Sequence, residues 1–202
     1  MEEPLDQIKT YVNQLSLISD DSWHEIKKIF QVAEFKKGAY FAKAGRIENQ
    51  FGILLDGVLR AYITNGDGSE HTKTIFTPIY FKTAISYVGA LTSLVTATPN
   101  RVNIQTLTPA KVFVGNYNDW KNLIDHNQEV AAWSRKMTEL FFIGKEQKEF
   151  EYFTLQADER YKLFRERYPE LENMIPQYQI ARFIGITPTQ LSRIRKRIFR
   201  EE

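Results

Sequence analysis

The stretch from residue 177 to 198, QYQIARFIGITPTQLSRIRKRI, constrains the fold more than any other part of the chain. Ala181 precedes Gly185 by four residues, and a small side chain there allows a second helix to approach closely. Gly185 can adopt the positive φ that ends a helix and turns the chain sharply. Thr187 can cap the next helix, and Pro188 suits its first position because no amide donor is lost there. The pattern predicts two short helices joined by a tight turn.

The second of these helices has two different sides. Gln190 lies three residues after Thr187 and completes a capping box, and Ile186 can pack on Leu191. Apolar side chains at helical spacing predict a core shared by both helices, formed by Ile180, Ile184, Leu191, Ile194 and Ile198. The opposite side of the second helix carries polar and basic side chains, namely Thr189, Ser192, Arg193, Lys196, Arg197 and Arg200.

A cationic, hydrogen-bonding face on a short helix behind a tight turn is what reading the major groove of DNA requires. We therefore interpret residues 177–198 as a DNA-binding helix-turn-helix. The alternative is an ordinary helical hairpin whose basic face is only solvated. The charge distribution favours DNA binding, because residues 177–202 hold six Lys or Arg and two Glu, a net +4, whereas the whole chain carries +2. A basic end on a mildly acidic body is typical of a protein that contacts nucleic acid with that end.

Composition excludes several other classes. The 202 residues contain no cysteine, so disulfides, thiolate zinc sites and cysteine-held iron–sulfur clusters are excluded. The N-terminus is acidic and polar, unlike a signal or transit peptide. No apolar run approaches the ~20 residues that a membrane span needs. We expect a cytoplasmic protein with no membrane partner.

Between residues 35 and 118 the pattern changes to short β-type runs separated by turn residues. The expected strands are residues 39–41, 51–55, 58–63, 72–76, 102–107 and 112–114, with turns at Gly38, Gly45, Gly57 and residues 66–68. Evenly spaced short strands build a sandwich or a barrel-like roll. Residues 5–34 are expected to form two short helices before it. We therefore expect an α+β fold that begins with an antiparallel β-roll.

Residues 127–153 form a long helical stretch without proline. One face carries Val130, Trp133, Met137, Leu140, Phe141 and Gly144, whereas Phe142, Ile143 and Phe150 lie elsewhere. The apolar face could simply pack on the β-roll. A helix that is apolar on more than one side has a second surface to cover, and the same helix of a second copy would cover it. We expect a homodimer whose interface uses the six side chains of that face. Thr154 is expected to cap a further helix that runs to Tyr168.

The order of these parts resembles the Crp/Fnr family of bacterial transcription regulators, over nearly the whole chain. The most specific likeness is residues 185–196, GITPTQLSRIRK, which resembles the recognition region of the compact branch common in Bacteroidetes-type bacteria. Residues 37–41 with Gly45, residues 51–60 (FGILLDGVLR) and residues 67–70 (DGSE) resemble the turns of the family's cyclic-nucleotide-binding-like jelly roll. The resemblance implies a sensor domain at residues 1–126, a dimerisation helix at 127–153 and a helix-turn-helix domain at 154–202.

The resemblance also implies a homodimer that binds palindromic promoter DNA, with RNA polymerase as a further candidate partner. Carried over to this sequence, Thr189 and Arg193 would face base edges, with Ser192 beside them. Near the phosphates, the resemblance implies Thr187, Gln190, Arg195 and Lys196. The chain ends at Glu202, directly after the recognition helix, so phosphate contacts from the C-terminal β-wing of many relatives are not expected.

The sensor half departs from the relatives that bind cyclic AMP. Those relatives use a Gly-Glu cassette for the ribose hydroxyl and an arginine for the cyclic phosphate, but no Asp or Glu occurs here between His71 and Asn118. We therefore expect no cyclic nucleotide and no other cofactor. The segment is aromatic and basic, and it suggests an unknown small-molecule effector bound by Phe81, Lys82, Tyr87 and Arg101. The alternative is that its aromatic side chains only fill the core.

No catalytic constellation is apparent in the sequence. The three histidines, His24, His71 and His126, lie in different regions, and no pair has the spacing of metal ligands. No serine stands in a recognisable nucleophile arrangement with a histidine. We expect no enzyme and no metal site. The remaining alternative is a small-molecule-binding or protein-interaction module of the same fold that does not bind DNA.

Overall fold

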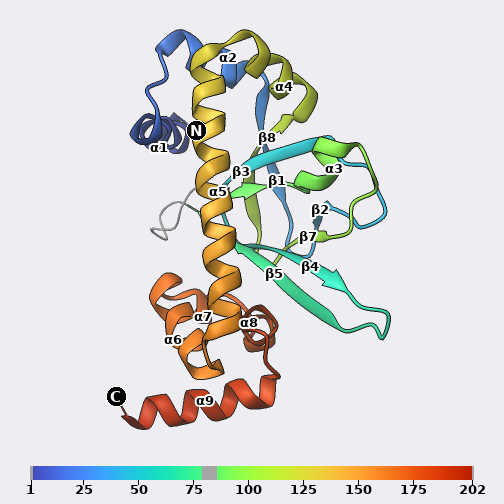
Figure 1. The fold of residues 1–202 in the computed structure, drawn as a ribbon, viewed down its shortest axis with the longest axis vertical. Helices are drawn as coiled ribbons and strands as arrows, with labels where there is room; N and C mark the ends of the chain where they lie inside the picture. Colours follow the sequence, from blue (N-terminus) through green and yellow to red (C-terminus); the bar gives the residue numbers. More distant parts are fainter. Residues whose placement is uncertain (1, 79–85, 202) are drawn as a thin grey trace.

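The computed structural model describes residues 2–78 and 86–201. Two antiparallel four-stranded sheets form a β-roll beside one long helix (Figure 1). The first sheet has the order β1 (Phe30–Phe35), β8 (Ala110–Asn116), β3 (Gln50–Asp56) and β6 (Tyr87–Val88). The second has the order β2 (Tyr40–Ala42), β7 (Asn103–Thr106), β4 (Leu59–Thr64) and β5 (Glu70–Phe76). The expected α+β fold with an antiparallel β-roll is confirmed.

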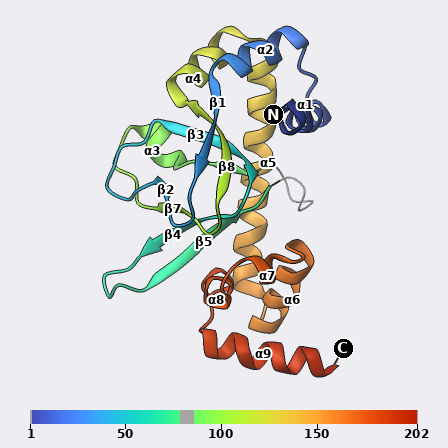
Figure 2. The same cartoon turned by 180° about the vertical axis from the view of Figure 1, so that it is seen from behind.

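The helices lie around the roll and at its two ends (Figures 1 and 2). Those before, within and directly after the roll are α1 (Glu2–Leu15), α2 (Asp20–Lys28), α3 (Leu91–Thr96) and α4 (Tyr117–His126). The long helix is α5 (Gln128–Thr154). It leads to α6 (Ala157–Arg167), α7 (Leu171–Met174), α8 (Gln177–Ile184) and α9 (Pro188–Glu201). α9 lies at the opposite end of the molecule from α2 and α4.

One local expectation before the roll was wrong, and one helix after it was not foreseen. Residues 30–34 were expected within a helical region, but with Phe35 they form β1, which pairs with β8 from Phe30 opposite Gly115 to Phe35 opposite Ala110. The ring of Phe30 also stacks on Phe113 at a centroid distance of 4.8 Å. This pairing and packing across the chain override the local helical spacing. The helix α4 was not foreseen, although the Asn116 side chain caps it.

A second expectation fails at the end of the long helix. Thr154 does not cap a new helix, because it is the last residue of α5 and its hydroxyl donates to the backbone oxygen of Phe150. The cap of α6 is Gln156, whose backbone N–H donates to Oε2 of Glu159 at 2.7 Å. The chain therefore breaks for two residues between α5 and α6.

The apolar side chains of the predicted dimer face are buried in the first part of α5 and exposed in its middle. Val130 and Trp133 are almost completely buried in the chain's own core, and Met137 packs against that core. From residue 138 to residue 147 every side chain of α5 is exposed. This exposed part carries four consecutive large apolar residues, Leu140, Phe141, Phe142 and Ile143. Among the described residues, no helix is both long and apolar enough to cross a membrane.

Candidate nucleic-acid interface

The turn between α8 and α9 has the geometry that its residues predict. Gly185 has φ +75° and ends α8, and the N–H of Ile186 donates to the oxygen of Ala181 at 3.0 Å. Ala181 is fully buried between the helices. The capping box also forms, because Gln190 N–H donates to Thr187 Oγ1 at 3.2 Å and Thr187 N–H donates to Gln190 Oε1 at 3.0 Å. These contacts fix the start and the direction of α9.

The two sides of α9 are separated as the pattern predicts. Leu191, Ile194 and Ile198 are buried in a cluster that includes Ile180 and Ile184 of α8. Six of the seven residues predicted to contact DNA are exposed, namely Thr187, Thr189, Gln190, Ser192, Arg193 and Lys196. Within the described part of the chain, neither Arg193 nor Lys196 has an ion-pair partner. Both cations therefore face solvent without a protein carboxylate to neutralise them.

Arg195 differs from these two residues because it is half-buried against the protein. Its Nε lies 3.5 Å from Oε1 of Glu172, and its guanidinium lies 5.7 Å from the ring centre of Phe199. The same Glu172 oxygen accepts a hydrogen bond from the Tyr161 hydroxyl at 2.6 Å. Burial and this hydrogen bond raise the pKa of Tyr161 to about 12. The structure thus ties Arg195 to α6 and α7, which sets it apart from the free basic face.

α8 also lies against the β4–β5 hairpin of the roll (Figure 2). Oε2 of Glu70 on β5 accepts two hydrogen bonds, from Nη1 of Arg60 on β4 and Nη1 of Arg182 on α8, each at 2.7 Å. Nη1 of Arg60 also donates to Oε1 of Gln179 on α8 at 2.9 Å. The Arg60 side chain is only 5% exposed, whereas 24% of Glu70 and 34% of Arg182 remain exposed, so this charged contact between roll and helix is partly buried.

Further contacts join the C-terminal helices to the rest of the molecule. Three apolar residues of the roll belong to the same cluster as the core of α8 and α9: Val58, Ile75 and Leu107. Lys148 of α5 donates to the backbone oxygen of Lys73 on β5 and lies 4.3 Å from the ring centre of Phe183 on α8. Burial, together with nearby Lys73 and Arg167, lowers the pKa of Lys148 to about 8. The helix-turn-helix is therefore docked on the roll and on α5.

The residues that hold α8 on the β4–β5 hairpin, Arg60, Glu70 and Arg182, were not predicted from the sequence. Arg60 stands inside the apolar run of residues 58–63. A charged side chain in such a strand needs a buried partner, so the sequence could have predicted a buried ion pair here. The partners themselves gave no local signal, because Glu70 and Arg182 are 112 residues apart.

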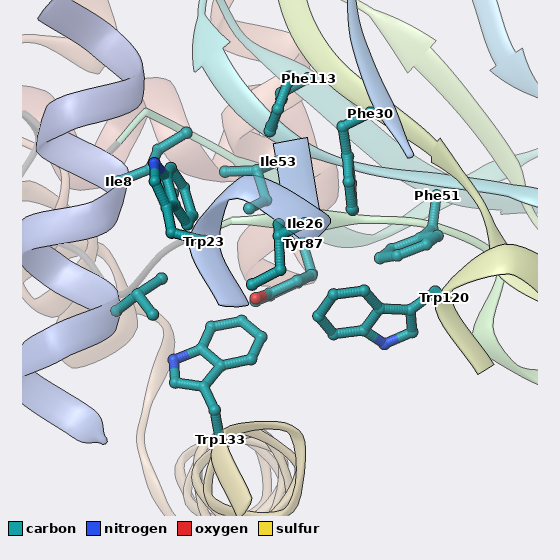
Figure 3. Close-up of a pocket in the computed structure, with 11 residues that line it drawn as sticks. Ile8, Trp23, Ile26, Phe30, Phe51, Ile53, Tyr87, Phe113, Trp120 and Trp133 are labelled. Atoms are coloured by element: carbon teal, nitrogen blue, oxygen red, sulfur yellow. The ribbon is translucent and has the colours of Figure 1, made fainter. Parts of the chain in front are cut away.

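The residues predicted to bind an effector do not form one site in the described structure. Phe81 and Lys82 lie outside the described residues. Arg101 is exposed in the loop before β7, whereas Tyr87 lies on β6 with its hydroxyl enclosed. The Tyr87 side chain points into an apolar cavity between the roll, α1, α2, α4 and α5 (Figure 3). Burial raises the pKa of Tyr87 well above its ordinary value.

In the described part of the roll, the interior leaves no polar site for a cyclic nucleotide. It is filled by buried apolar side chains, which include Phe41, Leu54, Leu59, Phe76 and Ile104. The buried hydroxyl on α3, Ser93, is already used, because it donates to the oxygen of Thr98 and accepts from the N–H of Glu48. No carboxylate is present between His71 and Asn118 to hold a ribose hydroxyl. Across the described ranges, no three His, Cys, Asp or Glu side chains are grouped so as to hold a metal ion.

Comparison with known proteins agrees with this geometry. The profile of the cyclic nucleotide-binding domain family matches residues 32–127. No curated protein sequence matches the chain. The c-di-GMP responsive global regulator CLP of Xanthomonas campestris is similar in structure, with 12% identity, a TM-score of 0.66, and 91% of this chain and 93% of CLP covered.

Two further solved structures are similar over most of their length. FixK2 from Bradyrhizobium japonicum has 13% identity and a TM-score of 0.67, with 86% of each chain covered. The catabolite activator protein of Thermus thermophilus has 15% identity and a TM-score of 0.55, with 91% of this chain and 85% of that protein covered. The protein thus has a cyclic nucleotide-binding-type domain joined to a helix-turn-helix. The described residues have the fold of these regulators, in agreement with the resemblance to the Crp/Fnr family found in the sequence.

Proposed function

We propose that the protein is a homodimeric, sequence-specific DNA-binding transcription regulator whose sensor domain does not use cyclic AMP. In this proposal residues 1–126 are the sensor, residues 127–153 the dimerisation helix and residues 154–202 the DNA-binding domain. RNA polymerase, an unidentified effector and a cytoplasmic location belong to the same proposal.

The free basic face of α9 carries the proposal. Arg193 and Lys196 are exposed and, among the described residues, unpaired, on a helix whose other side is buried. In this proposal Arg193 makes a bidentate contact with a guanine, and Thr189, near the start of the same helix, faces a neighbouring base edge. The N-terminus of α9, with Thr187 and Gln190, suits a phosphate because of its helix dipole and free amides. Arg195 is a weaker candidate for a phosphate contact, since Glu172 already engages it.

The exposed middle of α5 supports the dimer. A long helix with four adjacent large apolar side chains in water is unfavourable unless a partner covers it. Since Val130 and Trp133 serve the chain's own core, the proposed interface uses Leu140, Phe141 and Gly144. A two-fold dimer would place two α9 helices on successive major-groove turns, about 34 Å apart.

The test is to incubate the purified full chain with random genomic DNA fragments and to sequence the fragments that it retains. We expect a two-fold motif with half-sites about one helical turn apart. Binding to that motif should weaken with salt by about one log–log unit per phosphate neutralised. The matched control is the double variant Arg193→Ala, Lys196→Ala, which should recover no motif. Retention without any motif and without salt dependence would instead indicate a module that does not read DNA.

A further inference from the structure

Arg160 of α6 joins the end of α5 to the last residue before the turn of the helix-turn-helix. In both ribbon views α5 ends beside α6 and α8, and α9 lies beyond them (Figures 1 and 2). Nε of Arg160 donates to the backbone oxygen of Ile184, the last residue of α8, at 2.9 Å. Its Nη1 donates at 2.7 Å to the backbone oxygen of Leu155, the C-cap of α5, and lies 3.5 Å from that of Tyr152. One guanidinium therefore binds the C-terminal ends of two helices.

The chemistry of a guanidinium suits this position. The last carbonyl groups of an α-helix have no partner within the helix and carry a partial negative charge, which favours a cation. A guanidinium donates several hydrogen bonds in fixed directions within one plane, whereas a lysine ammonium is a single donor centre. In the part of the chain that the structure describes, half-buried Arg160 has no carboxylate partner. Its hydrogen bonds therefore go to the ends of α5 and α8.

Tyr152 brings the last turn of α5 against the same turn of the helix-turn-helix. Its ring is so close to Gly185 that a Cβ added there would lie 2.9 Å from Cε2 of the ring. The Arg160 guanidinium lies 5.4 Å from the centre of this ring. The ring also meets His71 of β5 edge to face, at 6.4 Å between centroids. The turn before α9 is thus linked to α5 by hydrogen bonds and by packing.

This link differs from the other polar contacts of the junction. Glu70 binds Arg182 of α8 and so joins α8 to the roll. Arg167 of α6 makes two hydrogen bonds to Glu151 of α5, but these do not reach α8. The contacts of Arg160 run from the end of α5 to the residue directly before the turn. Since these hydrogen bonds have fixed directions, they define the angle between the two helix ends.

We propose that Arg160 is a positioning residue, which holds the turn between α8 and α9 at a fixed place relative to the end of α5. Arg160 contacts no DNA in this proposal and acts through Ile184 and the turn. The consequence for DNA rests on the proposed function. If α5 is the dimerisation helix, a fixed place for each turn fixes the distance between the two α9 helices and hence the spacing of the half-sites.

The first test measures the position of α9 without DNA. The chain has no cysteine, so Glu146→Cys on α5 and Ser192→Cys on α9, both at exposed positions, introduce two sites for spin labels. Pulsed electron–electron double resonance measures the distribution of distances between the labels. An excess of unlabelled chain restricts the signal to distances within one chain. Adding Arg160→Lys keeps the charge but removes the planar fork, and we expect a roughly twofold broader distribution.

Tyr161→Phe is the matched control. Tyr161 follows Arg160 in α6, and its hydroxyl donates to Oε1 of Glu172 on α7 at 2.6 Å. The change removes a hydrogen bond from the same helix but no hydrogen bond to α5 or α8, so the distribution should stay as narrow as in the labelled parent chain. Circular dichroism checks that each variant is folded, and Arg160→Gln replaces Arg160→Lys if the lysine variant does not fold.

The second test selects DNA fragments with Arg160→Lys in the otherwise unchanged chain. Because Thr189 and Arg193 are intact, we expect the wild-type half-sites over a wider range of spacings. Affinity for the wild-type spacing should fall by on the order of tenfold, because charge-assisted hydrogen bonds no longer hold the turn. Tyr161→Phe should select the wild-type spacing. A loss of stability alone would reduce the amount of bound protein without widening the range of spacings.

Three results would overturn the inference. The first is a distance distribution in Arg160→Lys as narrow as that of the labelled parent chain. The second is equal broadening in Tyr161→Phe, and the third is an unchanged half-site spacing in Arg160→Lys. A wild-type chain that selects no motif would instead contradict the proposed function, and the distances between the labels would still decide the role of Arg160.

Discussion

Gly185 is the position in the turn where an added side chain would be tolerated least. Its φ is +75°, and a Cβ there would lie 2.9 Å from Cε2 of Tyr152 on α5. Gly185→Ala should therefore lower the free energy of unfolding by about 1–3 kcal/mol, measured by urea denaturation. Gly66→Ala is the control, because no atom lies within 4 Å of its added Cβ, and it should change stability by less than about 0.5 kcal/mol. Equal effects of both changes would contradict this account of the turn.

Arg193 is the residue on which sequence preference should depend. Arg193→Ala should weaken binding to a selected site by about 1–3 kcal/mol and should relax the preference among related sequences. Arg135→Ala provides the control, since Arg135 is exposed on α5, where it pairs with Glu139 at 3.2 Å, far along the chain from α9. Affinities for selected and random duplexes are measured by titration at fixed salt. If Arg193→Ala left both affinities unchanged, Arg193 would not contact bases.

At the scale of elements, the β4–β5 hairpin and α8 are joined by the carboxylate of Glu70. Glu70→Gln keeps the shape but removes the charge that two arginines share, and Arg60 is too buried to be stabilised by water. We expect a loss of about 3 kcal/mol in the free energy of unfolding. Glu34→Gln removes an equally direct pair, with Lys111 at 3.0 Å, but both side chains are exposed, so it should cost less than about 1 kcal/mol. If Glu70→Gln cost as little as Glu34→Gln, the contact between Glu70 and the two arginines would contribute little to the free energy of unfolding.

Lys148 links α5, β5 and α8 and makes this junction sensitive to pH. Its pKa of about 8 in the folded chain lies below the ordinary 10.5, which applies after unfolding. Between these values the unfolded chain binds the extra proton, so raising the pH favours the folded state. The stability of the wild type relative to Lys148→Met should therefore rise from about pH 8 towards 10.5. Urea unfolding at several pH values measures this difference, and a difference that stays constant would contradict the burial of the ammonium group.

At the scale of the whole molecule, the proposed dimer would cover the exposed middle of α5. Phe141 is 48% exposed on the face predicted for the dimer, and Phe141→Glu would place a charge in that interface. Sedimentation equilibrium should give a dimer for the wild type and a folded monomer for this variant. Leu17→Glu alters a residue that is 82% exposed between α1 and α2, and it should remain dimeric. A dimer of unchanged strength in Phe141→Glu would place the interface elsewhere.

The helix-turn-helix could be predicted in detail because its signals are local. The cap of α9, the positive φ of Gly185 and the buried side of α9 all depend on residues within about four positions of one another. The strands between residues 35 and 118, apart from β6, were predicted for a similar reason, since turn residues separate short apolar runs. Of the predicted effector residues, only Tyr87 and Arg101 belong to the described part of the chain; Tyr87 lies on β6 with its hydroxyl enclosed, whereas Arg101 is exposed in the loop before β7.

Three features required the tertiary structure. β1 forms because a distant strand pairs with residues 30–35, against their local helical spacing. Val130 and Trp133 were predicted for a dimer but lie in the chain's own core, because periodicity shows which face of a helix is apolar and not what covers it. The dock of α8 on the roll depends on Glu70 and Arg182, which folding alone brings together. The geometry of turns and helix caps is determined by residues that are neighbours in the sequence. Which surface packs on which is decided by the free energy of the whole fold, and the local sequence does not determine it.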